Sequence, residues 1–310
     1  GELSSKSKEE AQEHQVDFLR NFQSRLEVIA SDVEELKRSV EKPDFQYMAK
    51  KSLIAAGRME SGEKRKLLAS LLGDRLNTKT DFGEIVYNEA LETVAKLTDR
   101  QIKMLALQCD IGSVSQKNIP TWDQYNAGKK TLLAHVLPLN FQQSDLQHIS
   151  YSGCGSVSPF ETGLVQTIKA KYGNLFLKPI APDEPLFAEI KASAVFGLFY
   201  EKNGNLRFGA SKVWFEEIIR QSKGIDTALV GKIIPLYDTK GMNEDEALET
   251  IKTECFMGPE LIDAWNTKQL KHLSLTSVGM IIGVSVIEEV TQLRIGKDDW
   301  LGLTTVKANS

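Results

Sequence analysis

The sequence predicts a mainly α-helical protein: a helical bundle with an N-terminal heptad helix, followed by a second α-helical region. Two observations lead to this fold class. Apolar residues recur over residues 16–40 at alternating spacings of three and four, the pattern of a helix with one narrow apolar seam. Short segments with helical periodicity and capping residues then follow one another to residue 137, without the alternation of a convincing strand.

The heptad positions of the first helix are filled by aliphatic and aromatic side chains, and no Gly or Pro interrupts them before Pro43. They are Leu19, Phe22, Leu26, Ile29, Val33, Leu36 and Val40. Such a seam is buried either against residues 45–76 of the same bundle or against a second chain, self or another protein. Three heptads are short for an independent coiled coil, so support from the bundle is expected in both cases.

We expect three regions along the chain. A polar, disordered tail covers residues 1–15, because its composition is hydrophilic. An N-terminal helical bundle follows over residues 16–140, since helices joined by short links form antiparallel bundles. A C-terminal helical region covers residues 141–310.

Capping residues indicate where several helices begin. Ser61 precedes a leucine-rich helix, on which Lys64, Arg65 and Lys66 are expected to form a solvated face. Further N-caps are expected at Thr98, Ser211, Asp226, Asn243 and Thr276.

One segment of the second region has two interpretations. Residues 186–208 have the length and apolar spacing of a helix. They also contain Val, Phe and Tyr and the Asn203-Gly204 pair, which is typical of the turn in a β-hairpin. We prefer the helix. The hairpin remains the alternative, and it would give the fold a small β content.

The composition narrows the classes of function. The chain of 310 residues has a net charge of −4 and a pI of about 5.8, which gives no basic field for nucleic acid. Its three cysteines are odd in number and widely spaced, which argues against a disulfide framework and favours the reducing cytoplasm. The longest apolar run, residues 278–287, has about half of the roughly 20 residues that cross a bilayer. We therefore expect a cytoplasmic protein with no membrane or nucleic-acid partner. Because the chain begins with Gly, we also expect a native element before it.

Cys154 is the sharpest catalytic candidate. A thiol between Gly153 and Gly155 has an open backbone around it, and His148 lies six residues earlier. A cysteine nucleophile needs a base within hydrogen-bond reach and donors for an oxyanion. The competing interpretation, which we favour, is a tight turn in which Cys154 is a small buried filler. Whether the protein is an enzyme stays uncertain, and a non-enzyme is favoured.

A helix start beside this turn is the second candidate site. Ser158, Pro159 and Glu161 stand in the order N-cap, N1 and N3, which predicts a helix from there to Tyr172. Amides at a helix N-terminus attract anions, so this start would suit an anionic small ligand. The residues expected to bind it are Gly153, Gly155, Ser156 and Ser158.

No metal and no cofactor are expected. The four histidines are scattered and the sequence has no C-x-x-C pair. Phosphate-binding loops, dinucleotide fingerprints and nucleophile elbows are also missing from the sequence.

Five segments stand in a recognisable order: PDFQYMAKKSLIAAGRM, LLASLLGDRLN, YNEALETVAKLTDRQIKMLALQ, LQHISYSGCGSVS and NLFLKP. Together they resemble an uncharacterised bacterial protein family known by locus-tag names. The most specific piece is the Tyr-Ser-Gly-Cys-Gly-Ser turn at residues 151–156, and the resemblance covers about residues 16–180. The resemblance implies no assigned activity. In general character only, the family also resembles accessory proteins of bacterial antiviral loci.

The sequence therefore favours a non-enzymatic, oligomerising scaffold or sensor module of a bacterial cytosolic protein, with antiviral defence as a further hypothesis. One alternative is a cysteine-dependent enzyme that uses Cys154 and His148. The other is a sensor of anionic small ligands at the helix start of residues 153–161.

Overall fold

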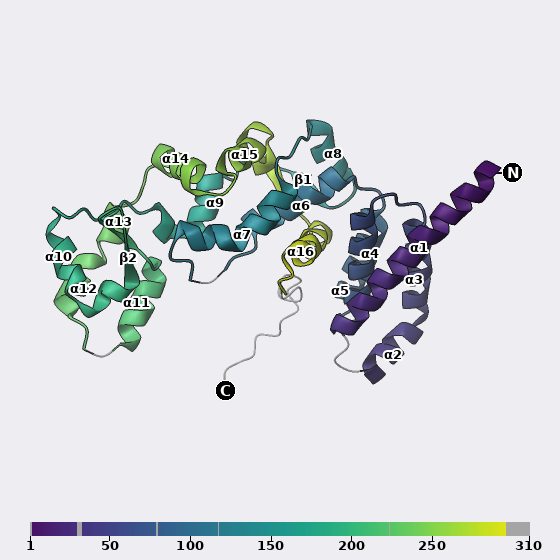
Figure 1. Cartoon of the computed structure of the whole chain (residues 1–310), viewed down its shortest axis with the longest axis horizontal. Coiled ribbons are helices and arrows are strands. Elements are labelled where there is room, and N and C mark those ends of the chain that lie inside the picture. Colours follow the sequence, from purple (N-terminus) through teal and green to yellow (C-terminus); the bar gives the residue numbers. More distant parts are fainter. Residues whose placement is uncertain (1, 30–32, 79, 117, 223, 296–310) are drawn as a thin grey trace. The chain divides into compact units, whose positions relative to one another are not determined.

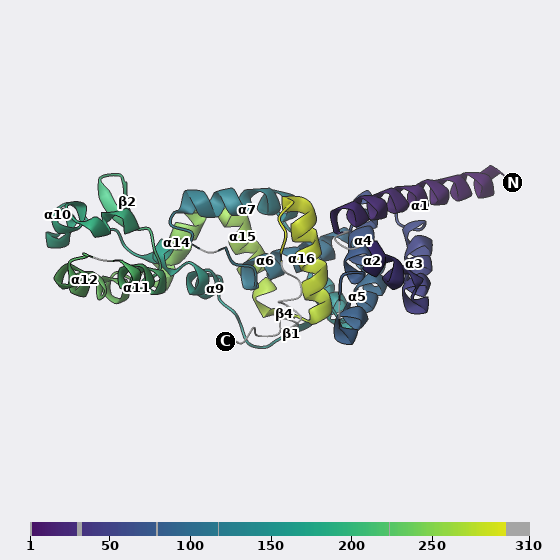
Figure 2. The same ribbon diagram turned by 90° about the horizontal axis from the view of Figure 1, so that it is seen from below.

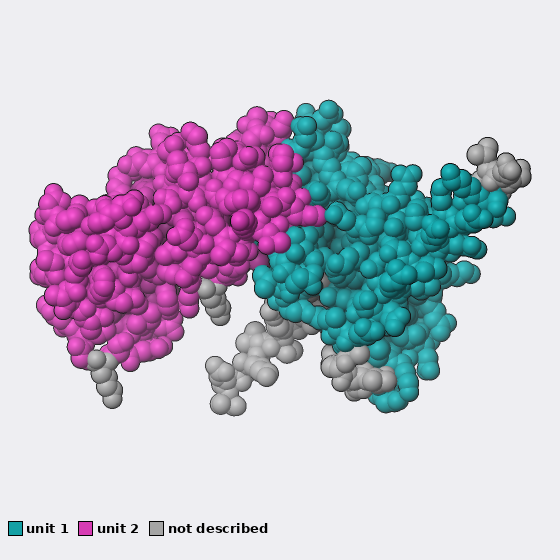
Figure 3. Space-filling model, in the orientation of Figure 1, with its two compact units in different colours: residues 1–110, 139–160, 272–310 teal, residues 111–138, 161–271 magenta. Residues whose placement is uncertain are grey.

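The computed structural model describes residues 2–29, 33–78, 80–116, 118–222 and 224–295 (Figure 1). The fold is mainly α-helical, as predicted, with two small antiparallel sheets among these residues. The chain forms two compact units (Figure 3): unit 1 is residues 1–110, 139–160 and 272–310, and unit 2 is residues 111–138 and 161–271. These units differ from the division expected at residue 140, because the chain leaves unit 1 and returns to it twice.

Unit 1 is built from helices and one short two-stranded ladder. Its elements are α1 (Glu2–Ile29), α2 (Val33–Glu41), α3 (Pro43–Ala56), α4 (Gly62–Arg75), α5 (Asp81–Val94), most of α6 (Asp99–Gly112), α8 (Gln143–Tyr151), β1 (Gly155–Val157), β4 (Leu273–Leu275) and α16 (Ser277–Thr291). Helix α4 lies at the centre, in contact with α1, α3, α5 and α16. Its leucines Leu67, Leu68, Leu71 and Leu72 are buried, as their broad stripe in the sequence predicts.

The first helix differs from its prediction at both ends. Residues 2–15, expected as a disordered tail, are helical and belong to α1. The expected single helix over residues 16–40 is described as two, with α1 ending at Ile29 and α2 beginning at Val33. The heptad is therefore not one continuous seam over the described residues.

The buried stripe of α1 is also rotated relative to the heptad. Phe18, which is not a heptad position, is 1% exposed and stacks on Phe22 with ring centroids 6.4 Å apart. Ile29 is buried, whereas Leu19 is 48% exposed. This rotation follows from the packing of α1 on α3 and α4, which brings Phe18 rather than Leu19 to the core.

The other heptad positions divide in the same way. Leu26 and Leu36 are partly buried, and Val40 is exposed. The side chain of Val33 lies outside the described residues. The apolar seam is thus partly buried within unit 1. There α1 packs on α3 and α4, which agrees with the predicted alternative of packing against residues 45–76 of the same chain.

Unit 1 holds buried arginines paired with carboxylates. Arg25 of α1 donates to Asp74 of α4, and its guanidinium lies 3.2 Å from a carboxylate oxygen of Glu288 in α16. Burial opposes the charge of Arg25, but Asp74 and then Glu288 more than offset it and raise the pKa of Arg25. Arg75, only 2% exposed, pairs with Asp44 at the start of α3. These pairs join helices that are distant in sequence.

Unit 2 has an aromatic core and a short hairpin. Its elements are α7 (Trp122–Val136), α9 (Leu164–Lys171), a 3-10 turn (Gly173–Phe176), α10 (Pro185–Lys191), a second 3-10 turn (Ala194–Leu198), β2 (Phe199–Lys202), β3 (Asn205–Phe208), α11 (Lys212–Gln221), α12 (Thr227–Ile233), α13 (Leu236–Thr239), α14 (Glu244–Glu254), α15 (Gly258–Ile262), a π-helical turn (Asp263–Thr267) and a third 3-10 turn (Leu270–His272) that ends in unit 1. Phe208 packs against Phe199 and Tyr237, with ring centroids 5.2 and 4.9 Å away.

The ambiguous segment 186–208 contains both predicted structures. Its first part is α10, and its last part is the β2–β3 hairpin. Asn203 and Gly204 form the turn with φ of 54° and 75°, left-handed values that these two residues adopt readily. The preference for one continuous helix was wrong, because the hairpin buries Phe199, Leu206 and Phe208 on one face.

Most of the capping predictions are confirmed. Ser61, Ser211, Asp226, Asn243 and Thr276 all accept a backbone N–H as N-caps. Thr98 and Gln101 exchange hydrogen bonds at the start of α6. In the described part of the chain, no helix is both long and apolar enough to cross a membrane.

Candidate functional site

The Gly-Cys-Gly turn lies in unit 1 between α8 and β1. The Cys154 amide donates to Ile149 O at 3.1 Å, and the Cys154 carbonyl accepts the Thr276 amide at 3.0 Å. Gly153 has a φ of +75°, a left-handed value that favours glycine. The turn is therefore anchored on both sides by backbone hydrogen bonds.

The first turn of α16 packs directly on this motif. A Cβ added to Gly279 would lie 1.9 Å from the carbonyl oxygen of Cys154, so only glycine permits the approach. The Thr276 hydroxyl also donates to Gly153 O at 2.6 Å. The motif holds the N-terminus of α16 against the turn, which is a structural role for its glycines.

The Cys154 thiol is poorly suited to nucleophilic attack. Its side chain is 0% exposed, and burial raises its pKa to about 12. The thiol therefore keeps its proton at neutral pH, whereas the thiolate is the nucleophile. These features match the buried filler that we favoured from the sequence.

His148 takes part in a different group of residues. Its Nδ1 lies 3.0 Å from Oε1 of Gln101 in α6. Gln101 in turn donates to the buried Asp145, which also pairs with Arg100. Within the described residues, no hydrogen bond joins His148 to Cys154, so the geometry gives the thiol no base.

The helix expected from Ser158 to Tyr172 forms only over Leu164–Lys171, so its predicted start was wrong and its predicted end is confirmed to within one residue. The chain passes from β1 through a non-helical segment to α9, which begins at Leu164. The Ser158 amide donates to His272 O at 2.8 Å, which continues the antiparallel pairing of β1 with β4. The Ser158 hydroxyl accepts the Phe160 amide at 3.0 Å in a local turn. The local signal at Ser158 was overridden by this pairing with a strand that is distant in sequence.

The anion site predicted at residues 153–161 therefore loses its basis. No helix begins within residues 153–161, because the N-cap of α9 is Gly163. The amides of Gly153, Cys154 and Ser158 already donate to carbonyls. Gly155 and Ser156, the other predicted ligand residues, belong to β1 and pair with β4.

The basic run of α4 was expected to be solvated, and for two of its residues this was wrong. Lys64 Nζ donates to Leu97 O at 2.7 Å. Arg65 Nε donates to Asp17 of α1 at 2.7 Å, and its guanidinium also binds the carbonyls of Met59 and Glu60. The run therefore ties α4 to its neighbours.

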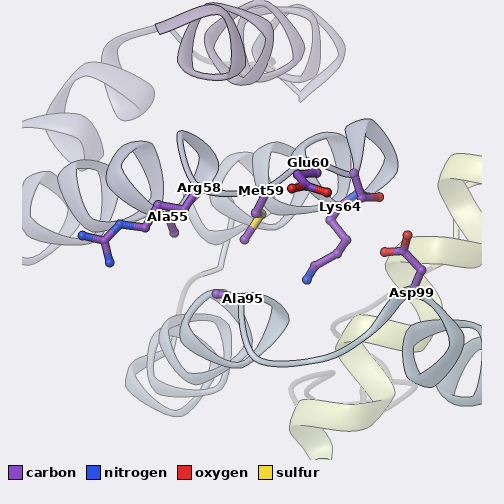
Figure 4. A pocket seen from close by; sticks show the side chains of 8 residues that line it. Ala55, Arg58, Met59, Glu60, Lys64, Ala95 and Asp99 are labelled. Carbon is purple, nitrogen blue, oxygen red and sulfur yellow. The ribbon is translucent and has the colours of Figure 1, made fainter. Parts of the chain in front are cut away.

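A cavity of about 550 Å³ opens where α3 and α5 end and α4 and α6 begin. Figure 4 shows Lys64 and Asp99 reaching into it, while Arg58 extends away from both. Burial lowers the pKa of Lys64, against the opposing influence of Asp99. The lining includes no histidine or cysteine, so this cavity suits binding of a polar molecule better than cysteine- or histidine-dependent catalysis.

Metal ligands do not gather in the described structure: no group of three or more His, Cys, Asp or Glu side chains in it could hold an ion. The sequence did not indicate this cavity, because its lining residues come from separate helices and follow no common spacing along the chain.

A protein-family model that carries only a locus-tag name matches residues 1–301 of the chain. The chain belongs to this uncharacterised family. The match extends well beyond residues 16–180, which carried the resemblance in the sequence, and it gives no activity. No curated protein and no solved structure matches the chain.

Proposed function

We propose that the chain is a non-enzymatic assembly module of a bacterial cytosolic protein, and that it self-associates through α1. One observation carries the proposal: Val16 and Leu19, one helical turn apart on α1, remain 54% and 48% exposed although the opposite flank of the helix is docked. In Figures 1 and 2 the N-terminal end of α1 also projects past α3 and α4.

A second copy of the chain is the partner that we propose. Twofold dimers bury the same patch on both copies, so a short exposed apolar pair can be self-complementary. Covering Val16 and Leu19 removes apolar surface from water twice in such a dimer. The net charge of −4 gives no comparable attraction for nucleic acid.

The rest of the heptad has a smaller part in this proposal than the sequence suggested. Phe22, Leu26 and Ile29 already face the interior of unit 1 to different degrees. Leu19 is the heptad residue of α1 that stays available. The resemblance alone supports a role in antiviral defence. A role as a sensor would in addition require a site that binds a ligand.

Light scattering tests the proposal on the full chain. We expect a concentration-dependent dimer for the unaltered protein and a monomer for the double variant Val16→Glu/Leu19→Glu, because each copy would bring two carboxylates into the buried interface. Val213→Glu is the matched control, since Val213 is 75% exposed in unit 2 and should leave the dimer intact. A monomer at all concentrations, or a double variant that still dimerises, contradicts the proposal.

A further inference from the structure

The cavity of Figure 4 is lined by a lysine that has no carboxylate partner. Lys64 belongs to the basic run of α4, whose other two members, Arg65 and Lys66, both form ion pairs. Among the described residues no ion pair includes Lys64, and its Nζ donates to Leu97 O at 2.7 Å. The carbonyl oxygen occupies one N–H of the amine, so the lone pair of the uncharged form stays free to react.

The surroundings of Lys64 favour the uncharged form of its amine. The side chain is partly buried, and burial lowers its pKa although the carboxylate of Asp99 acts in the opposite direction. The hydrogen bond with Glu92 instead raises the pKa of Lys51, which lies on the neighbouring helix α3. An amine without its proton is the nucleophile, and removal of a lysine from water is one way in which proteins activate it.

The cavity gives a small molecule room to reach this nitrogen. Its volume of about 550 Å³ lies within the range of small-molecule sites. Ala55, Met59 and Ala95 supply apolar surface to the lining. Figure 4 shows Lys64 extending into the space that these side chains border. The site therefore suits a molecule with a short apolar part and one group that reacts with an amine.

The charges of the lining select against an anionic molecule. Glu60 and Asp99 both line the cavity, and among the described residues neither carboxylate forms an ion pair. Arg58, the second cation of the lining, extends away from Lys64 in Figure 4. When Lys64 is uncharged, the two carboxylates are the charges nearest to it, so they repel an anion and admit a neutral molecule.

We propose that Lys64 binds a small neutral aldehyde covalently in this cavity, as an imine. The lone pair of Nζ forms a bond to the carbonyl carbon, and the proton that the nitrogen loses is taken up by the carbonyl oxygen. Loss of one water molecule from this carbinolamine leaves the C=N bond. The protonated imine keeps a single N–H, which Leu97 O can accept, and its positive charge is offset by Asp99. Covalent binding here goes beyond the assembly role of α1 and does not depend on it.

Reductive trapping of the full chain tests this proposal. The protein is incubated with 2-methylpropanal and sodium cyanoborohydride, whose hydride converts an imine into a stable secondary amine. Peptide mapping by mass spectrometry then gives the rate of labelling at each lysine. We expect Lys64 to be labelled about tenfold faster than Lys252 of α14, a control lysine with a 56% exposed side chain. Equal rates at the two lysines overturn the proposal.

A variant distinguishes the cavity from a merely accessible amine. Ala95 is exposed and lines the cavity, so Ala95→Phe is expected to fold and to fill the space beside Lys64. Labelling of Lys64 should become about tenfold slower in this variant, because the aldehyde loses its access to the amine. Labelling of Lys252 should not change. An unchanged rate at Lys64 contradicts the placement in the cavity.

A second aldehyde tests the selection by charge. Glyoxylate is a small aldehyde that carries a carboxylate, which Glu60 and Asp99 should repel. Its preference for Lys64 over Lys252 should therefore be weaker than that of 2-methylpropanal. An equal or stronger preference overturns the restriction to neutral aldehydes.

Discussion

Units 1 and 2 are stabilised by different chemistry. Unit 1 buries charged side chains between its helices, as in the group of Arg25, Asp74 and Glu288. Unit 2 packs aromatic rings against one another, as Phe208 does with its neighbours. The ion pairs described in unit 2 are partly or largely exposed, as in Lys202 with Glu254, whose side chains are 34% and 27% exposed.

The difference teaches where each unit is vulnerable. A buried ion pair is stabilising only while both partners are present, because removal of one leaves an unpaired charge in a dry environment. Substitution in an apolar core costs less stability, since a smaller apolar side chain gives up only part of the buried surface. Unit 1 should therefore be sensitive to single charge removals, and unit 2 to changes of volume.

The largest effect is expected for Arg25→Met. The variant leaves Asp74 and Glu288 buried without their cation, so unit 1 should lose about 3–5 kcal/mol of its free energy of unfolding. Hydrogen exchange of peptides from α4 and α16 measures this loss. Lys202→Met, which breaks a partly exposed pair in unit 2, should cost less than about 1 kcal/mol. Equal losses in the two variants would remove the distinction between the units.

A smaller effect is expected for Phe208→Leu in unit 2. The substitution keeps an apolar side chain but removes ring contacts with Phe199 and Tyr237, which should cost about 1–2 kcal/mol. Urea unfolding followed by tryptophan fluorescence suits this test, because Trp122, Trp214 and Trp265 all belong to unit 2. The loss should be the same in low and high salt. A strong dependence on salt would indicate that charges also stabilise this core.

The smallest effect is expected for Glu184→Gln. Burial opposes its charge, but the hydrogen bonds from Lys240 and from the Ala181 amide prevail and lower the pKa of Glu184. The stabilisation is therefore present above the usual glutamate pKa of about 4.3 and is lost as the pH falls through the lower folded value.

Because Glu184 is more than a third exposed, screening by water and salt keeps the difference from the unaltered protein well under 1 kcal/mol at pH 7. Urea unfolding between pH 2 and pH 7 measures it. A difference that grows toward low pH would show that the assigned sign is wrong.

Local chemistry was predictable from the sequence, and long-range packing was not. The N-caps at Ser61 and Thr276 depend on residues within one helical turn, and both form as expected. The rotation of α1 depends on which face α4 covers, so the sequence of α1 alone favoured Leu19 over Phe18. The helix signal at Ser158 failed for the same reason, since the Ser158 amide donates to His272 O, directly before β4.

The same distinction between local chemistry and long-range packing applies to the candidate site. The sequence indicated a glycine turn at Cys154, where Gly153 has a φ of +75°. It could not show that Gly279 of α16 closes over it, because that contact joins two distant parts of the chain. Ser70 stands within a leucine-rich helix, and only the arrival of α1 and α16 places it in the lining of a cavity.

The position of α16 in the chain has a consequence for synthesis on the ribosome. This helix supplies part of the core beside α4 and α5, yet it is translated after all of unit 2. Neither strand of the β1–β4 ladder can pair until residues 273–275 emerge. A nascent chain that stalls before α16 therefore exposes the apolar faces of α4 and α5, and such a product is a substrate for chaperones and proteases rather than a smaller working protein.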